Sequence, residues 1–304
     1  MSNILETSIG PLKLKNPVIA ASGTFGYGVE YSEIMDVSLL GGVSVKGISL
    51  EPRAGNPPPR ICETPSGMLN SIGLANIGYD AFVNNTMPLL RQMGVTVIVN
   101  TYGTCIDDFA QLAQRFSHVE GVAALEVNIS CPNVKAGGIH FGVSPKPAAE
   151  VTNAVRKATG LPLIVKLSPE AVDLPEVAQA VADAGADAIS MINTFRGMSI
   201  DVKTRKPRLG AVMGGMSGPA IRPLAVRLVY QVHQKTKIPI IGMGGITCLS
   251  DVLEFFLAGA SAVQIGTASY INPSIGIEII NEFEEYCASR SIKPSDLTGK
   301  VIVD

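Results

Sequence analysis

The chain has 304 residues, of which 46% are hydrophobic and 16% are charged, and its formal net charge at pH 7 is −2. An ordinary domain carries about 25% charged residues, so much of this chain should be interior, and its length allows one large α/β barrel or two ordinary domains. A net charge this close to zero provides no basic field, which argues against nucleic acid or a membrane surface as a partner.

The N-terminal residues MSNILETSIG lack the basic segment and apolar run of a secretory signal. Residues 255–277 carry no charge and are long enough to be considered as a membrane span. This stretch contains glycine, asparagine and proline, which fit a buried strand followed by a polar loop better than a lipid-facing helix. We therefore expect a cytoplasmic protein.

Eight short apolar runs rich in β-branched residues recur along the chain, each closed by Gly, Ser, Asn or Pro. Continuous rather than alternating hydrophobicity is typical of parallel strands that are covered on both faces. The predicted strands are 17–22, 41–48, 95–103, 122–130, 161–169, 186–194, 238–246 and 261–268.

Segments with helical spacing of apolar residues lie between several of these strands. Four such segments end near glycine or a polar residue, at 144–160, 174–186, 218–236 and 248–260. Repeated strand–helix units of this number predict an α/β protein with a (β/α)8 TIM barrel.

Two parts of the sequence do not belong to a minimal barrel. Residues 8–17 resemble a short hairpin that closes the barrel floor, and residues 51–78 form an insertion after the second strand, rich in Pro, Gly and Asn. Insertions at the carboxyl ends of strands fall on the catalytic face, so this insertion should wall the pocket. No linker or repeat divides the chain, which predicts a single domain over 1–304.

The predicted strands end in polar or glycine residues despite their apolar bodies. Asn and Gly are ordinary turn residues when taken singly, but barrel active sites lie at this end of the strands, and eight such endings exceed what turns require. The strand-end residues are Ser22, Lys46, Asn100, Asn128, Lys166, Asn193 with Thr194, Gly244 with Gly245, and Gly266 with Thr267.

The glycine turns after the last two strands indicate a phosphate site. Gly244, Gly245, Gly266 and Thr267 allow backbone N–H groups to approach a phosphate closely, and Gly218, at the start of a predicted helix, could contribute.

Lys166 and Lys46 lie at strand ends within otherwise apolar surroundings. Lys166 could be an amine that forms a Schiff base, as in a class I aldolase, a fixed cation that stabilises a reduced flavin, or a lysine whose tip reaches solvent. Three asparagines, Asn70, Asn128 and Asn193, each offer a donor and an acceptor, which suits a planar cyclic amide such as a pyrimidine.

Five cysteines are scattered along the chain, and their odd number and wide spacing indicate neither a disulfide framework nor a zinc or iron–sulfur ligand set. Cys62, Cys105, Cys248 and Cys287 are expected to be buried, reduced thiols. Cys131 stands between two asparagines and before a proline, and its residue type alone leaves open whether it is buried or reactive.

Several motifs together resemble class 1 dihydroorotate dehydrogenases: NISCPNVKAGG (128–138), NSIGLANIG (70–78), PVIAASGTFGYG (17–28), LIVKLSP (163–169), INTFRG (192–197) and GMGGI (242–246). SCPNVKAGG is most similar to subclass B, the catalytic subunit of the NAD-linked enzyme of pyrimidine biosynthesis. The resemblance covers essentially the whole chain in order.

The resemblance implies which residues bind the cofactor and which bind the substrate. FMN would be held by Ser22, Lys46, Gly47, Asn100, Asn128, Lys166, Ile192, Gly218, Gly244, Gly245, Gly266 and Thr267. Dihydroorotate would be bound by Lys46, Asn70, Ser71, Ile72, Gly73, Leu74, Asn128, Asn193 and Thr194.

The resemblance also makes Cys131 the catalytic base, on a loop with glycine hinges at Gly137 and Gly138. A thiol has an unperturbed pKa of about 8.5, close enough to working pH to remove a proton from carbon 5 of the substrate. The flavin would accept a hydride from carbon 6, with Lys166 offsetting the resulting charge.

The electrons must then reach NAD. A dinucleotide fingerprint reads G-x-G-x-x-G, whereas GTFGYG (23–28) has the reverse spacing. The family resemblance implies a partner subunit with FAD and a 2Fe–2S cluster, in a heterotetramer of two catalytic and two electron-transfer chains built on a homodimer of this chain. The alternatives are the fumarate-using subclass, a lysine-dependent aldolase or synthase barrel, and a flavin-binding subunit without catalysis.

Overall fold

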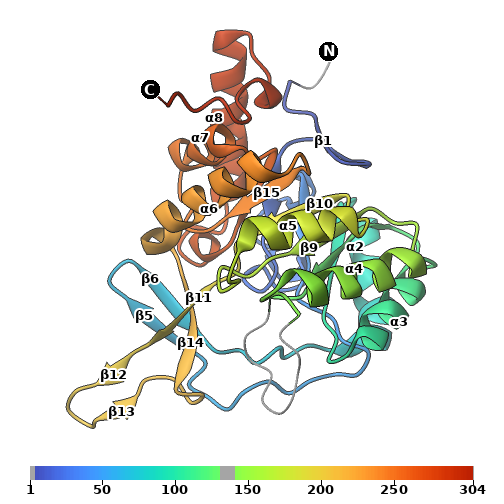
Figure 1. The fold of residues 1–304 in the computed structure, drawn as a ribbon. Helices are drawn as coiled ribbons and strands as arrows, with labels where there is room; N and C mark the ends of the chain where they lie inside the picture. Colours follow the sequence, from blue (N-terminus) through green and yellow to red (C-terminus); the bar gives the residue numbers. More distant parts are fainter. Residues whose placement is uncertain (1–3, 131–140, 304) are drawn as a thin grey trace.

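All eight predicted strands form one closed parallel barrel in the computed structural model, which describes residues 4–130 and 141–303. The barrel order is β3–β4–β7–β8–β9–β10–β15–β16, with β16 pairing back onto β3 (Figure 1). The predicted TIM barrel is therefore confirmed. Its strands are β3 Val18–Ala20, β4 Gly42–Ser44, β7 Val97–Thr101, β8 Val122–Asn128, β9 Leu163–Lys166, β10 Ala188–Met191, β15 Ile240–Met243 and β16 Ala262–Ile265.

Helices cover the outside of the barrel, and the four predicted helical segments are among them. The spacing that produces them is clear in α3, whose buried residues Phe109, Leu112, Ala113 and Phe116 form one face. The α-helices are α1 Gly78–Ala81, α2 Met87–Gln92, α3 Ile106–Phe116, α4 Pro145–Ala158, α5 Leu174–Asp183, α6 Arg222–Lys235, α7 Leu249–Ala258 and α8 Ile275–Arg290. Short helical turns are η1 Val29–Tyr31, η2 Val37–Leu39, η3 Phe82–Thr86, η4 Pro219–Ile221, η5 Thr267–Tyr270 and η6 Pro294–Asp296.

The predicted N-terminal hairpin closes the floor of the barrel. It consists of β1 Thr7–Ile9 and β2 Leu12–Leu14, which pair antiparallel. Its apolar side chains share one buried cluster with inward-facing residues of seven barrel strands. The floor is therefore a packed apolar plug, and any site must lie at the opposite end.

Two insertions, rather than one, build a separate sheet at that opposite end. The predicted insertion after β4 supplies the hairpin of β5 Ile61–Thr64 and β6 Gly67–Asn70. A second insertion, after β10, was not predicted; it contributes β11 Phe195–Met198 and β14 Met213–Ser217. The four strands form one sheet in the order β11–β14–β6–β5, which projects beyond the barrel (Figure 1). The tip of the second insertion forms β12 Ile200–Asp201 and β13 Lys206–Pro207.

The inside of the barrel changes from apolar to polar along its axis. Residues two apart on a strand face the same side, and in β8 this places Ala124, Glu126 and Asn128 in successive inward layers. Ala124 belongs to the apolar floor cluster, Glu126 is buried, and Asn128 reaches the open end. The interior thus has a polar layer directly beneath the face where the strands end.

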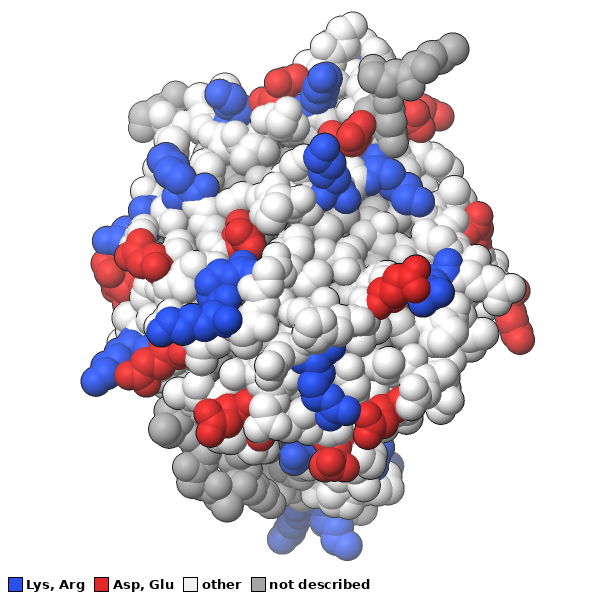
Figure 2. Space-filling view, turned by 90° about the vertical axis from the view of Figure 1, so that its right-hand side faces the viewer, with Lys and Arg blue, Asp and Glu red and all other residues white. Residues whose placement is uncertain are grey.

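The uncharged stretch 255–277 runs from α7 through β16 and η5 into α8, as a strand followed by a polar loop. Among the helices in the described residues, none has both the length and the apolar character needed to cross a membrane. Acidic and basic side chains are interspersed over the face shown in Figure 2, with no extended field of one sign.

Candidate active site

The residues at the carboxyl ends of the eight barrel strands surround one cavity. Its space amounts to about 1260 Å³, including the open mouth. Its lining includes residues from the end of every barrel strand and from both insertions, so a ligand bound here would contact many separate parts of the chain. The predicted strand-end residues that line it are Ser22, Lys46, Asn100, Asn128, Lys166, Asn193, Thr194, Gly244, Gly245, Gly266 and Thr267.

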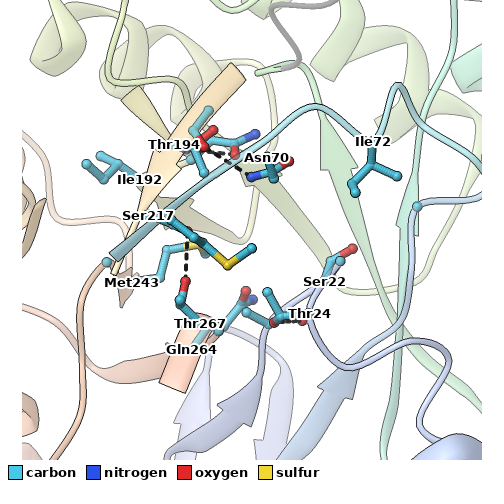
Figure 3. A pocket seen from close by; sticks show the side chains of 18 of the residues that line it. Ser22, Thr24, Asn70, Ile72, Ile192, Thr194, Ser217, Met243, Gln264 and Thr267 are labelled. Atoms are coloured by element: carbon cyan, nitrogen blue, oxygen red, sulfur yellow. Dashed lines mark hydrogen bonds between the residues drawn. The ribbon is translucent and has the colours of Figure 1, made fainter. Parts of the chain in front are cut away.

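The insertion sheet forms the opposite wall of this cavity. Met68 and Asn70 of β6 and Ser217 of β14 line it, and the Asn70 amide donates a hydrogen bond to the Gly215 carbonyl at 3.3 Å. Figure 3 shows Asn70 and Ser217 facing the barrel residues Ser22 and Gln264 across the opening. The prediction that the first insertion walls the pocket is confirmed, and the second insertion shares this wall.

The NSIGL segment only partly faces the cavity. Asn70 and the residues at 72–74 line it, but Ser71 is fully buried and does not. The Ser71 hydroxyl accepts a hydrogen bond from Asn56 at 2.8 Å, and its N–H donates to the Arg60 carbonyl at 2.7 Å. The structure therefore uses the hydroxyl, the N–H and the carbonyl of Ser71 to hold the insertion together.

Glycines form a cradle at one end of the cavity. Gly218, Gly244 and Gly245 have φ values of 98°, 130° and 77°, which side chains with a Cβ rarely adopt. A Cβ at Gly245 would lie 2.7 Å from the Gly218 carbonyl oxygen. Beside them, the Thr267 hydroxyl lies 2.8 Å from the Ser217 hydroxyl (Figure 3), which connects β14 to the turn after β16. Because these glycines have no side chains, their backbone N–H groups can be approached closely by an anionic group such as a phosphate.

A buried carboxylate lies beneath the cavity, and sequence reasoning missed it. Glu126 is fully buried, and its Oε2 lies 3.8 Å from the Nζ atom of Lys166, which is 5% exposed. Burial raises the pKa of Glu126, but the Lys166 ammonium and hydrogen bonds from Ser44, Ser190 and Gln264 outweigh it and hold the pKa below its ordinary value. Lys166 therefore has a fixed counter-ion and its ammonium is held at the cavity floor.

Two buried amide oxygens of cavity-lining residues have no hydrogen-bond partner among the described residues. They are Oδ1 of Asn100 and Oε1 of Gln264, and both residues line the cavity. Buried acceptors are normally hydrogen-bonded, so this pair fits a ligand that brings donors. Gln264 was not predicted as a site residue. The sequence pattern that could have indicated it is its position two residues before the strand-end Gly266, which places both residues on the same inward face of the strand.

A chain of hydrogen bonds orients the substrate-side amides. The Thr194 N–H donates to Oδ1 of Asn193 at 2.8 Å, and Nδ2 of Asn193 donates to the Ser130 hydroxyl at 2.7 Å. That hydroxyl donates to Oδ1 of Asn128 at 2.8 Å. The amides of Asn128 and Asn193 are therefore held in fixed orientations, as a recognition site for a planar polar molecule requires.

Cys131, Gly137 and Gly138 lie outside the described residues, so the predicted base and its hinges stay predictions. The expectation of burial for the other cysteines is right for Cys287, and Cys62 is half-buried.

For Cys105 and Cys248 the expectation of burial is wrong, because both are exposed. Each occupies the N-cap position of a helix, α3 and α7 respectively, at the surface rather than in a strand. Within residues 4–130 and 141–303, no group of three or more His, Cys, Asp or Glu side chains is arranged to hold a metal ion.

A (β/α)8 barrel with a polar, glycine-lined cavity at the carboxyl ends of its strands defines a barrel protein with an enzyme-like site. A sequence model of the family described as dihydroorotate dehydrogenase matches residues 4–287. The dihydroorotate dehydrogenase B (NAD(+)), catalytic subunit, of Trichlorobacter lovleyi is 54% identical over 292 residues, or 96% of each chain. Proteins of the same name from Desulforamulus reducens and Geotalea uraniireducens are 54% and 50% identical, over 95% and 98% of each chain. The chain therefore belongs to the dihydroorotate dehydrogenase family.

Proposed function

We propose that this chain oxidises (S)-dihydroorotate to orotate in the biosynthesis of UMP, as the FMN-containing catalytic subunit of an NAD-linked dihydroorotate dehydrogenase. The observation that carries the proposal is the near full-length match to relatives named as that subunit. Their name favours the NAD-linked subclass over the fumarate-using one, and over a lysine-dependent aldolase or a non-catalytic flavin protein.

The described residues fit FMN. The glycine cradle of Gly218, Gly244 and Gly245 suits its phosphate, and the unpartnered oxygens of Asn100 and Gln264 suit ring N–H or ribityl O–H donors. The residues that would hold the cofactor are Ser22, Lys46, Gly47, Asn100, Asn128, Lys166, Ile192, Gly218, Gly244, Gly245, Gly266 and Thr267, all of which line the cavity. When bound, FMN supplies the hydride acceptor of the reaction.

Lys166 supplies a positive charge at the cavity floor. Its ammonium, held by Glu126 at the cavity floor, stabilises negative charge that develops on the cofactor side during oxidation. The ion pair with Glu126 supports this role over the Schiff-base alternative, because it ties the Lys166 side chain to a fixed counter-ion at the cavity floor.

The substrate would lie between the insertion wall and the ordered amides. Lys46, Asn70, Ile72, Gly73, Leu74, Asn128, Asn193 and Thr194 line this part of the cavity. The Lys46 ammonium suits the substrate carboxylate, and the amides of Asn70, Asn128 and Asn193 suit the alternating N–H and C=O groups of the pyrimidine ring. Ser71 would act by fixing the backbone of its neighbours.

Cys131 would remove the proton from carbon 5. Ser130, which immediately precedes it in the sequence, is hydrogen-bonded to both Asn128 and Asn193. The Cys131 thiolate would accept the proton while the hydride leaves toward the flavin.

Electrons would leave through a second protein, because GTFGYG does not have the spacing of a dinucleotide fingerprint. We propose a partner with FAD and a 2Fe–2S cluster, in a cytoplasmic heterotetramer of two catalytic and two electron-transfer chains, with this chain forming a single domain and the central homodimer.

Assays with different electron acceptors test this function. The pure chain should reduce an artificial dye with dihydroorotate, and should reduce NAD⁺ only after the partner is added. Efficient NAD⁺ reduction by the chain alone would refute the need for a partner, and turnover with fumarate would assign the chain to the other subclass.

A further inference from the structure

One carboxylate organises the layer beneath the cavity. Glu126 of β8 accepts hydrogen bonds from the Ser44 and Ser190 hydroxyls at 2.7 Å each. It also accepts from Nδ2 of Asn100 at 2.5 Å and from Nε2 of Gln264 at 2.7 Å. These four donors come from β4, β10, β7 and β16, so the network crosses the barrel from several sides.

The network fixes which way the two amides point. An ionised carboxylate only accepts hydrogen bonds, so Asn100 and Gln264 must turn their NH₂ groups toward Glu126. Their oxygens are thereby turned away from it, and both are buried without a partner among the described residues. The Asn100 oxygen lies beside Gly47, where a Cβ would be only 2.9 Å from it. Both residues line the cavity.

Hydroxyls can reverse donor and acceptor by rotation, but an amide must turn over completely. A reversed Asn100 or Gln264 would place an oxygen against the carboxylate, which is electrostatically unfavourable. Ser44 and Ser190 do not line the cavity, so they supply donors to Glu126 without presenting a group to a ligand. The arrangement therefore makes this part of the floor an acceptor surface.

We propose that Glu126 is a positioning residue that sets the hydrogen-bond polarity of the cofactor site, and that Gln264 together with Asn100 accepts from the imide N–H of the flavin ring. This inference rests on the proposed function, since it takes the cavity to hold FMN. Oxidised flavin carries a single ring N–H, at N3, flanked by two carbonyl groups. A floor of acceptor oxygens selects a ring with that N–H, whereas exposed NH₂ groups would suit a ring without it.

Binding of two flavins to the cofactor-stripped full chain tests the proposal. The dissociation constants of FMN and of N3-methyl-FMN, which has no ring N–H, are measured by quenching of flavin fluorescence. The informative quantity is the dissociation constant of N3-methyl-FMN divided by that of FMN, because this ratio measures the preference for FMN. In Glu126→Gln, a neutral amide at position 126 can donate as well as accept, which allows Asn100 and Gln264 to reverse, so the preference for FMN should fall by about tenfold.

Two further variants make the test decisive. Gln264→Leu removes one acceptor oxygen and should also reduce the ratio, by about fivefold to tenfold, which decides the matter if Glu126→Gln does not fold. Ser44→Ala removes a hydrogen bond from the same carboxylate without altering a cavity-lining group, and should keep the wild-type ratio. Circular dichroism verifies that each variant is folded.

The possible results distinguish a failure of this inference from a failure of the proposed function. An unchanged ratio in both Glu126→Gln and Gln264→Leu would overturn the inference and show that any preference for FMN is steric. A ratio that falls equally in Ser44→Ala would overturn it too, since the effect would then be general loosening of the barrel. If the wild-type chain binds neither flavin, the proposed function itself fails.

Discussion

Removing the charge of Lys166 should destabilise the protein strongly, because it leaves Glu126 buried without its counter-ion. The Lys166 Nζ and Glu126 Oε2 atoms are 3.8 Å apart, and the side chains are 6% and 0% exposed. At an effective dielectric constant of about 20, two unit charges at this distance attract by about 4 kcal/mol. Loss of one partner of a buried pair typically costs about 3–5 kcal/mol. We therefore expect Lys166→Met to lower the free energy of unfolding by about 4 kcal/mol.

A double-mutant cycle isolates this pair. Urea unfolding of the cofactor-free protein is followed by circular dichroism for the wild type, Lys166→Met, Glu126→Gln and the double variant. The double variant should lose at least about 2 kcal/mol less than the sum of the single losses, because it contains no unpaired charge. A coupling energy below about 0.5 kcal/mol would show that the two charges are not energetically linked.

The stability difference between the wild type and Glu126→Gln should depend on pH, and the direction of this dependence follows from the pKa of Glu126. The folded-state pKa of Glu126 lies below its ordinary value, so its ionisation stabilises the fold above the unfolded pKa of about 4.3. This contribution is lost as the pH falls through the lower folded-state pKa. The stability advantage of the wild type over Glu126→Gln should therefore be constant from about pH 8 to 5 and shrink below about pH 4.

Three further predictions concern the reaction, the cradle and the thiols. Cys131→Ala should retain FMN but lose most dihydroorotate turnover, and Cys131→Ser should keep some activity, mainly at high pH; an alanine variant with a near-normal rate would exclude Cys131 as the base. Gly245→Val should weaken FMN binding by at least about tenfold, since φ is 77° and a Cβ would lie 2.7 Å from a carbonyl oxygen; unchanged affinity in a fluorescence titration would contradict a cradle at this turn. When the native protein is treated with iodoacetamide at pH 8 and analysed by mass spectrometry, the exposed Cys105 and Cys248 should be labelled and Cys287 should not. Burial raises the pKa of the Cys287 thiol to about 11, so little reactive thiolate is present at this residue. Labelling of Cys287 as fast as the exposed pair would contradict this.

The barrel could be read from the sequence because its strands are buried on both faces. Continuous apolar runs such as 161–169 contain the strand β9 Leu163–Lys166, and their polar endings mark the open end of the barrel. The second insertion escaped prediction because β11 and β14 are rich in Gly and Met and are half-exposed, so they have no strand-like pattern of their own. Their pairing with β6 is a tertiary contact that local sequence does not specify.

The polar layer beneath the site was missed for a related reason. Glu126 appears as a single acid within the apolar run 122–130, which reads as a strand without regard to which residues face inward. Counting back by two from Asn128 places Glu126 inside the barrel, and counting back by two from Gly266 places Gln264 there. The orientation of Ser71 could not be counted in this way, because it lies just beyond the end of β6, where the alternation stops.

The proposed function requires that this cavity holds FMN and that dihydroorotate reduces it. The most direct measurement is the visible absorption spectrum of the purified chain, recorded before and after anaerobic addition of dihydroorotate. We expect a yellow protein whose flavin absorption is bleached by the substrate. A colourless protein, or a yellow one whose spectrum dihydroorotate leaves unchanged, would contradict it.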